Sequence, residues 1–376
     1  MNRAFIWLRN YGFGSRSMPS LDGLRAISIL LVLLSHCLGT HGFPQLPSRW
    51  FALGDFGVRI FFVISGFLIT SILIRELDGT QTISLSRFYI RRAMRLLPAL
   101  YVYIGVVVLL AYAGIVRVTD RDIAFGLTYS MNFDTVPGWN FGHFWSLAIE
   151  EQFYLLWPFG LLLLRTRRAA AKFLAGVLIV DPFIRIASHY VGPAFNFFVW
   201  TDALGSGCLL ALLRTELADN RHYRRVLESR WFFLVPTIAL LCNYIPSTKL
   251  SWLFGVTIMN VSIAMTIDWA MRNTTGIAGR FLNQPAISFL GVASYSIYVW
   301  QQVFIDRHAD NWFNVFPVNV ALALAAAMMS YLLIECPCLR LRSALFRRVS
   351  LSRTAQLAAA QSSSRGTDRP SAAAGQ

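Results

Sequence analysis

Ionisable side chains inside apolar segments are the residues of this 376-residue sequence that could carry chemistry. The segment SLDGLRAISILLVLLSHC, residues 20–37, holds Arg25 near its start and His36 deep in its apolar run. The two residues are eleven positions apart, so on an α-helix they share one face and stand roughly 16 Å apart. Such groups cost several kcal/mol in lipid unless they are paired or hydrated, which makes both of them functional candidates.

Further ionisable residues are expected at the depth of His36. Counting about 1.5 Å per residue inward from the outer surface gives one layer that contains Asp55, Arg59, Glu150, Glu151, Arg185 and Asp202. This convergence predicts a polar cavity. Two structural alternatives stay open: His36 as a hydrogen-bonding group between helices, and Asp55 with Arg59, at i and i+4, as an ion pair.

The elements that must position these groups are membrane helices. The chain is 56% hydrophobic with a mean hydropathy of +0.52, and its apolar residues come in blocks of about 20. We therefore predict an all-α fold, a polytopic membrane helical bundle of about ten transmembrane helices. The expected spans lie near residues 22–40, 52–74, 96–116, 144–164, 173–191, 197–213, 231–246, 251–271, 285–305 and 315–335.

Charge sets the expected orientation. The net charge of +15 comes from basic residues clustered between the apolar blocks, in 75–95, 165–172, 214–230 and after 335, so nucleic-acid binding is not expected. The positive-inside rule then predicts that both termini are cytoplasmic, in the inner or plasma membrane of the cell. Segment 117–143 is weakly apolar and is interpreted as re-entrant or interfacial.

Three regions are expected along the chain. Residues 1–20 form a cytoplasmic N-terminal segment without a cleavable signal peptide, and residues 21–340 form the membrane domain. Residues 341–376 form a cytoplasmic tail, basic and then Ser, Ala and Gly rich, that we predict to be disordered. The five cysteines show no C-x-x-C spacing, so no metal site is expected.

Five segments together resemble the integral membrane acyltransferase family 3, which includes bacterial O-antigen acetylases. The resemblance covers nearly all of residues 18–340 and is strong because the segments occur together in this order and spacing. They are LDGLRAISILLVLLSH, with an arginine and a histidine eleven apart, GDFGVRIFFVISGFLI, FYIRRAMRLLPAL, FWSLAIEEQFYLLWP and SYLLIECPCLR.

The resemblance implies which residues serve the donor. It implies an acyl-CoA donor from the cytoplasm and no tightly bound cofactor. Arg25, Arg92 and Arg95 would hold the phosphates of CoA, because guanidinium groups match phosphate oxygens. Arg92 and Arg95 lie three apart, so on a helix they project to one side. Their alternative role is to set topology and contact lipid head groups.

The resemblance also implies the catalytic residues. His36 corresponds to the family's catalytic histidine, and Glu150 and Glu151 to its acidic pair. The hypothesis is a general base, His36, that is oriented by one of the two glutamates. The oxyanion would be stabilised by Arg59 or a backbone amide, and an acyl-histidine intermediate stays open. Many relatives have histidine where this chain has Gln301, and we assign Gln301 no catalytic role.

The predicted function is a membrane O-acyltransferase. It would move an acyl group, by expectation acetyl, from acyl-CoA to a hydroxyl of a carbohydrate or another small hydroxylated acceptor, in contact with the lipid bilayer. The runner-up is a multi-pass transporter or flippase for a glycan or acidic metabolite, which would also need buried charge. A transporter of two halves predicts an internal repeat, and no strong one is visible.

Overall fold

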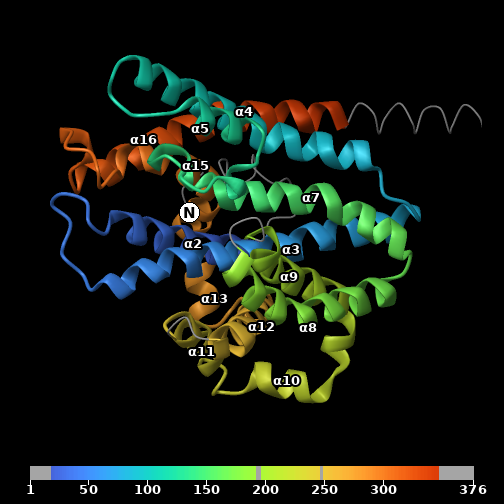
Figure 1. Cartoon of the computed structure of the whole chain (residues 1–376). Helices are drawn as coiled ribbons and strands as arrows, with labels where there is room; N and C mark the ends of the chain where they lie inside the picture. The colour runs from blue at the N-terminus through green and yellow to red at the C-terminus, as the bar shows by residue number, and fades with distance from the viewer. Residues whose placement is uncertain (1–17, 192–195, 246–248, 347–376) are drawn as a thin grey trace, which may run out of the picture.

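The computed structural model describes residues 18–191, 196–245 and 249–346, and within these ranges the chain is helical without a strand (Figure 1). The predicted all-α class is therefore confirmed. Six helices are long and apolar enough to cross a membrane. They are Pro19–Cys37 (α2), Ser48–Thr80 with α3 at Ala52–Thr80, Leu85–Tyr112 (α4), Trp139–Leu164 with α6 at Trp139–Gly142 and α7 at Phe144–Leu164, Ser251–Arg272 with α12 at Val256–Arg272, and Val318–Phe346, which starts with α16 at Val318–Ser330.

The other predicted spans are not among these six, so the count of about ten stays a prediction, as does the cytoplasmic position of both termini. Helices α8 (Arg167–Val191) and α9 (Asn196–Asp219) are long but carry several charged residues. Helix α11 (Leu234–Asn243) is only 10 residues long. The predicted span 285–305 is divided at Ala293 into α14 (Pro285–Val292) and α15 (Ser294–Phe304).

Shorter helices fill the connections. Segment 117–143 contains α5 (Asp120–Leu127) and one turn at Met131–Phe133 before α6, so no helix that starts and ends within it is long enough to span a bilayer. Helices α10 (Arg221–Glu228) and α13 (Ile277–Leu282) are also short. The last helix continues to Phe346, beyond the predicted domain boundary at residue 340. Most of the predicted N-terminal segment and tail lies outside the described residues.

Helices α2 and α3 form the middle of the bundle. In Figure 1 they lie between a group that contains α4, α7, α15 and α16 and a group that contains α8, α9 and α12. Helix α2 contacts α3, α14 and α15, while α3 contacts α9, α12 and α7. Residues that project from α2 and α3 are therefore placed to meet residues from both groups.

The contact between α3 and α9 depends on glycine. A Cβ atom added at Gly66 would lie 2.0 Å from the carbonyl oxygen of Leu204, and one added at Gly207 would lie 2.0 Å from that of Val63. No side chain fits at such distances, so the two backbones pack directly against each other, as small residues allow between membrane helices. The relative position of α3 and α9 is thereby fixed.

Candidate active site

A cavity of about 340 Å³ lies between α2, α3, α4 and α7, and we call it the arginine cavity. Its polar wall contains Asp22, Arg25, Ser65, Ser71, Arg75, Arg92, Arg95, Glu150, Tyr154 and Tyr295. Both Arg92 and Arg95 belong to this wall, as their spacing on α4 predicted. Four guanidinium groups around one cavity exceed the two carboxylates of its wall, Asp22 and Glu150, and favour an anionic ligand.

The two glutamates of α7 organise this wall. Glu151 accepts a hydrogen bond of 3.1 Å from Nη2 of Arg92, whose guanidinium also lies 3.7 Å from the ring centre of Tyr154. Glu150 accepts hydrogen bonds from the hydroxyls of Ser65 and Tyr154. The carboxylates therefore hold Arg92 and the polar lining of the cavity in place.

Arg95 has a different environment. Its electrostatic neighbours include three arginines, Arg25, Arg92 and Arg342, and the carboxylate of Glu335. Glu335 is buried and accepts a hydrogen bond from the hydroxyl of Ser296. Positive charge thus exceeds negative charge around Arg95, which again favours an anion in the adjacent cavity.

A second, smaller cavity of about 50 Å³ continues from the first. It shares Arg25, Ser65, Glu150 and Tyr295 with the arginine cavity and extends to Ser146 and Tyr298. The Tyr298 hydroxyl lies 2.6 Å from the Ser146 hydroxyl and donates a bond of 2.8 Å to the carbonyl of His143. Polar groups therefore follow one another from the arginine cavity to the start of α7.

His36 lies beyond the end of this polar series, in the last turn of α2. Its ring is 6.2 Å from the ring of Trp139, edge to face, and it interacts with the side chain of Gln301. Gln301 is fully buried, and its Nε2 donates to the carbonyl of Tyr298 at 3.3 Å. Nδ1 of His36 and Oε1 of Gln301 are buried without a hydrogen-bond partner. Because an unpaired buried acceptor is costly, such atoms mark a place for a donor.

A second histidine near His36 was missed by the sequence analysis. His143 is 4% exposed and interacts electrostatically with His36. One ring nitrogen lies 3.2 Å from the carbonyl of Val299, so it carries the proton, and the other, Nδ1, is buried without a partner. Its position directly before the FWSLAIEEQ segment was the signal that could have identified it.

Arg307 contributes a positive charge on the same side. Its guanidinium lies between the rings of Phe51 and Trp139, at 4.8 and 4.9 Å from their centres, and it interacts electrostatically with His36. The surroundings of His36 are thus an amide, a second imidazole, an indole and a guanidinium. We call His36, Trp139, His143, Gln301 and Arg307 the His36 niche.

The predicted pairing of His36 with the acidic pair does not match the contacts of the described residues. The hydrogen-bond partners of Glu150 and Glu151 are Ser65, Tyr154 and Arg92. The reason is that His36 and the two glutamates lie at different depths along the helices. Helix α2 ends at Cys37 rather than near residue 40, so His36 lies at a helix end. Glu150 follows His143 by seven residues, which is about 10 Å along α7.

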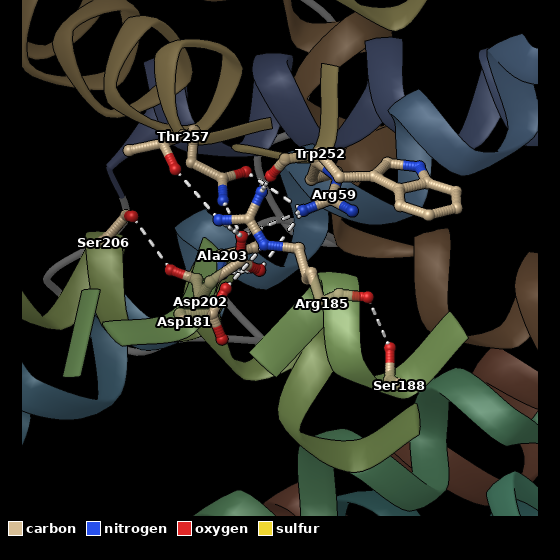
Figure 2. Close-up of polar contacts among 10 residues, drawn as sticks. Arg59, Asp181, Arg185, Ser188, Asp202, Ala203, Ser206, Trp252 and Thr257 are labelled. Carbon is tan, nitrogen blue, oxygen red and sulfur yellow. Dashed lines mark hydrogen bonds and ion pairs between the residues drawn. The ribbon is translucent and has the colours of Figure 1, made fainter. Parts of the chain in front are cut away.

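Three of the other residues predicted for one layer, Arg59, Arg185 and Asp202, converge in a separate cluster (Figure 2). Arg59 donates to Asp202 at 3.2 Å and to Asn260 at 3.3 Å, and Asn260 donates to Asp202 at 2.6 Å. The hydrogen-bonded partner of Arg59 is thus Asp202 from α9, while Asp55, the alternative at i−4, interacts with Arg59 electrostatically.

Arg185 completes this cluster, which we call the locked ion cluster (Arg59, Asp181, Arg185, Asp202, Asn260). Its Nε donates to Asp181 at 2.6 Å, and its terminal nitrogens donate to the carbonyl of Trp252 at 2.7 Å and to Thr257 at 2.9 Å. Arg185 also lies 3.5 Å from Asp202. Two arginines and two aspartates thus neutralise one another in the interior.

Comparison with known proteins identifies the class of protein. A family model described as an acyltransferase domain matches residues 18–336. The chain therefore belongs to this family of membrane acyltransferases, as its sequence motifs indicated. No solved structure matches the chain.

Two relatives from Staphylococcus aureus make the similarity more specific. The chain is 31% identical over 360 residues to "Putative O-acetyltransferase SAS0844" of strain MSSA476. It is 29% identical over 356 residues to "O-acetyltransferase OatA" of strain NCTC 8325. Each alignment covers 86% of this chain but only 57% and 58% of the relative, so the chain spans little more than half the length of these relatives.

Proposed function

We propose that the chain is a membrane O-acyltransferase that moves an acyl group, acetyl in the simplest case, from acyl-CoA to a hydroxyl of a carbohydrate or a similar acceptor. Family membership and the names of the relatives support the class of reaction. The observation that carries the proposal is the arginine cavity, from which a polar series leads through Ser146 and Tyr298 to His143 of the His36 niche.

The donor enters the arginine cavity in this proposal. CoA carries several phosphate charges, and Arg25, Arg92 and Arg95 supply charge-assisted hydrogen bonds to such groups. The pantetheine arm follows the polar series past Glu150 and Tyr298 toward the His36 niche. Glu150 and Glu151 then act on the donor side, where they hold the cavity wall, and not directly on His36.

The reaction needs one base and one proton transfer. His36 accepts the proton of the acceptor hydroxyl as its oxygen attacks the thioester carbonyl carbon. A C–O bond forms and the C–S bond breaks. The CoA thiolate leaves and takes the proton from His36, so no other reactant is needed. Arg307, whose side chain lies near His36, supplies positive charge for the developing oxyanion.

Gln301 orients the base in this mechanism. Because its Nε2 is held by the carbonyl of Tyr298, its Oε1 faces away from that bond and is available to an N–H of His36. A hydrogen bond to one ring nitrogen fixes the tautomer and leaves the lone pair of the other nitrogen for the acceptor hydroxyl. Gln301, to which the sequence alone gave no catalytic role, therefore orients His36 in the proposed mechanism.

Release of the CoA thiol from acetyl-CoA by the purified full chain in detergent tests the proposal. No membrane gradient is present in this assay, and water replaces the unidentified acceptor. Turnover that disappears in His36→Ala supports the acyltransferase. A protein that binds acetyl-CoA or glycans but never cleaves the thioester would instead support the transporter.

The proposed orientation has its own test. We propose that the basic segment 75–95 faces the cytoplasm, which gives cytoplasmic acyl-CoA access to the arginine cavity. A single cysteine at Gly79, an open position on α3, should react with an impermeant thiol reagent only after cells are permeabilised. Labelling in intact cells would reverse the orientation.

A further inference from the structure

A second polar groove lies at the end of the bundle where α3, α9 and α12 finish. Its volume is about 540 Å³, and its wall includes Ser71, Arg75, Asp78, Arg214, Thr215 and Arg272. Ser71 and Arg75 also line the arginine cavity. The groove and the cavity are therefore adjacent compartments that share one wall, and a single extended ligand can occupy both.

The arginines of this groove are held in place by a buried acid. Asp268 is 0% exposed and lies 2.9 Å from Nε of Arg272 and 3.6 Å from Nε of Arg214. It also accepts a hydrogen bond of 3.2 Å from the hydroxyl of Tyr223. Both arginines contact Asp268 through Nε and not through their terminal nitrogens. Asp268 thus holds Arg272 by a hydrogen bond and Arg214 by a longer ion pair at the edge of the groove.

The charge of the groove is positive even when its acids are counted. Asp78, which belongs to the wall, forms an ion pair with Arg167 from α8. Asp268 is shared between two arginines, and Arg75 adds a third guanidinium group. A phosphate monoester, with up to two negative charges and three acceptor oxygens, fits such a group of fixed donors.

The size of the arginine cavity indicates why a second compartment is needed. At about 340 Å³ it is at the lower end of the range of about 300–1,000 Å³ for small-molecule sites. Acyl-CoA consists of a thioester arm, a diphosphate and an adenosine that carries a 3′-phosphate. The arm and the diphosphate suit the cavity, and the nucleotide then extends beyond its mouth.

We propose that the groove binds the nucleotide end of the acyl-CoA donor and that Arg75, Arg214 and Arg272 recognise its 3′-phosphate. This inference rests on the proposed function and adds a distinction to it: the protein selects acyl-CoA over donors that lack the 3′-phosphate. Arg75 stands at the shared wall, between the 3′-phosphate in the groove and the diphosphate in the cavity.

The test compares two donors on the full-length protein in a neutral detergent, acetyl-CoA and acetyl-3′-dephospho-CoA. Release of the thiol gives KM and kcat for each. We expect the wild-type protein to have a KM about 10- to 100-fold lower for acetyl-CoA, the scale of hydrogen bonds to a charged group. This comparison requires no variant, so it does not depend on whether a variant folds.

Variants then locate the discrimination. Arg214→Gln, which lies in the groove and not in the arginine cavity, should raise the KM for acetyl-CoA severalfold, while the KM for the dephospho donor and both kcat values stay within about twofold. Arg272→Lys keeps a charge beside Asp268 and should have a smaller effect. Arg225→Gln on α10, an exposed arginine outside the groove wall, is the matched control and should change neither KM.

The outcomes distinguish a failure of the 3′-phosphate site from a failure of the proposed acyltransferase function. Equal KM values for the two donors in the wild-type protein would overturn the 3′-phosphate site and leave the acyltransferase standing. Equal increases for both donors in the arginine variants, reversed by added anionic lipid, would show that the groove binds lipid phosphate and would also overturn it. Thioester cleavage of neither donor by the wild-type protein would overturn the proposed function and this inference with it.

Discussion

The arginine cavity and the locked ion cluster contain similar side chains but differ in how the charges of their arginines are balanced. In the cluster, Arg59 and Arg185 meet Asp181, Asp202 and Asn260, and the two aspartates balance the two arginines. In the cavity, four arginines line the wall with only two carboxylates, Asp22 and Glu150, around about 340 Å³ of space. The burial of an arginine does not by itself indicate a functional site.

The balance of charge around an arginine is what distinguishes the two regions. A charge-balanced group such as the cluster contributes to one defined packing of α3, α8, α9 and α12. An excess of positive charge is favourable only when an anion is bound. We therefore expect substitutions in the cluster to change stability, and substitutions in the cavity or the His36 niche to change activity.

The largest effect on activity is expected for His36→Ala. Loss of a general base typically lowers the rate by 10²–10⁴-fold, and thioester cleavage should fall accordingly while the melting temperature stays near that of the wild type. His41→Ala is the control, because His41 pairs with Asp310 at an exposed site. More than about a tenth of the wild-type rate in His36→Ala would exclude His36 as the base.

The largest effect on stability is expected for Asp202→Asn. It leaves Arg59 and Arg185 with one carboxylate instead of two, and removal of one partner of a buried ion pair costs about 3–5 kcal/mol. Thermal unfolding of the purified protein measures the loss. Asp55→Asn, on the same helix as Arg59, should cost much less. Similar melting temperatures for both variants would contradict the division between cluster and cavity.

The double variant Arg92→Gln and Arg95→Gln tests the arginine cavity, where donor binding and not stability should change. Two charge-assisted contacts to the donor are lost, so binding should weaken by about 2–4 kcal/mol with stability nearly unchanged. Calorimetric titration with a non-hydrolysable acyl-CoA analogue measures it. If these arginines serve topology alone, the dissociation constant stays the same and the amount of inserted protein falls.

The smallest effect is expected for Gln301→Met, which removes an orienting acceptor and keeps the side-chain length. We expect kcat to fall about tenfold with KM for acetyl-CoA unchanged, because the donor site is not touched. Gln302→Met is the control, since Gln302 is the next residue and is also buried. A proportional loss in both variants would indicate damage to α15 rather than loss of orientation.

The sequence predicted the all-α membrane class, the family and the meeting of Arg92 with Arg95 in one wall, because these follow from hydropathy, motifs and helical spacing. It did not predict the partner of Arg59, because spacing within one helix pointed to Asp55 while the true partner lies on α9. It missed His143 and the use of Gln301, since contacts between helices far apart in sequence have no local signal.

The direct backbone contact of α3 with α9 has a consequence for motion. At Gly66 and Gly207 neither helix can shift toward the other, and 67% of the residues in the apolar window of Ser48–Thr80 are buried, so the pair moves as one rigid body. In α4 that share is 33%, and its polar contacts include Arg92 with Glu151, the Tyr89 hydroxyl with the carbonyl of Leu155 at 2.8 Å and the Tyr295 hydroxyl with the carbonyl of Leu96 at 2.7 Å. Entry and release of a bulky donor would then proceed by outward displacement of α4, with the α3–α9 pair as the stationary frame.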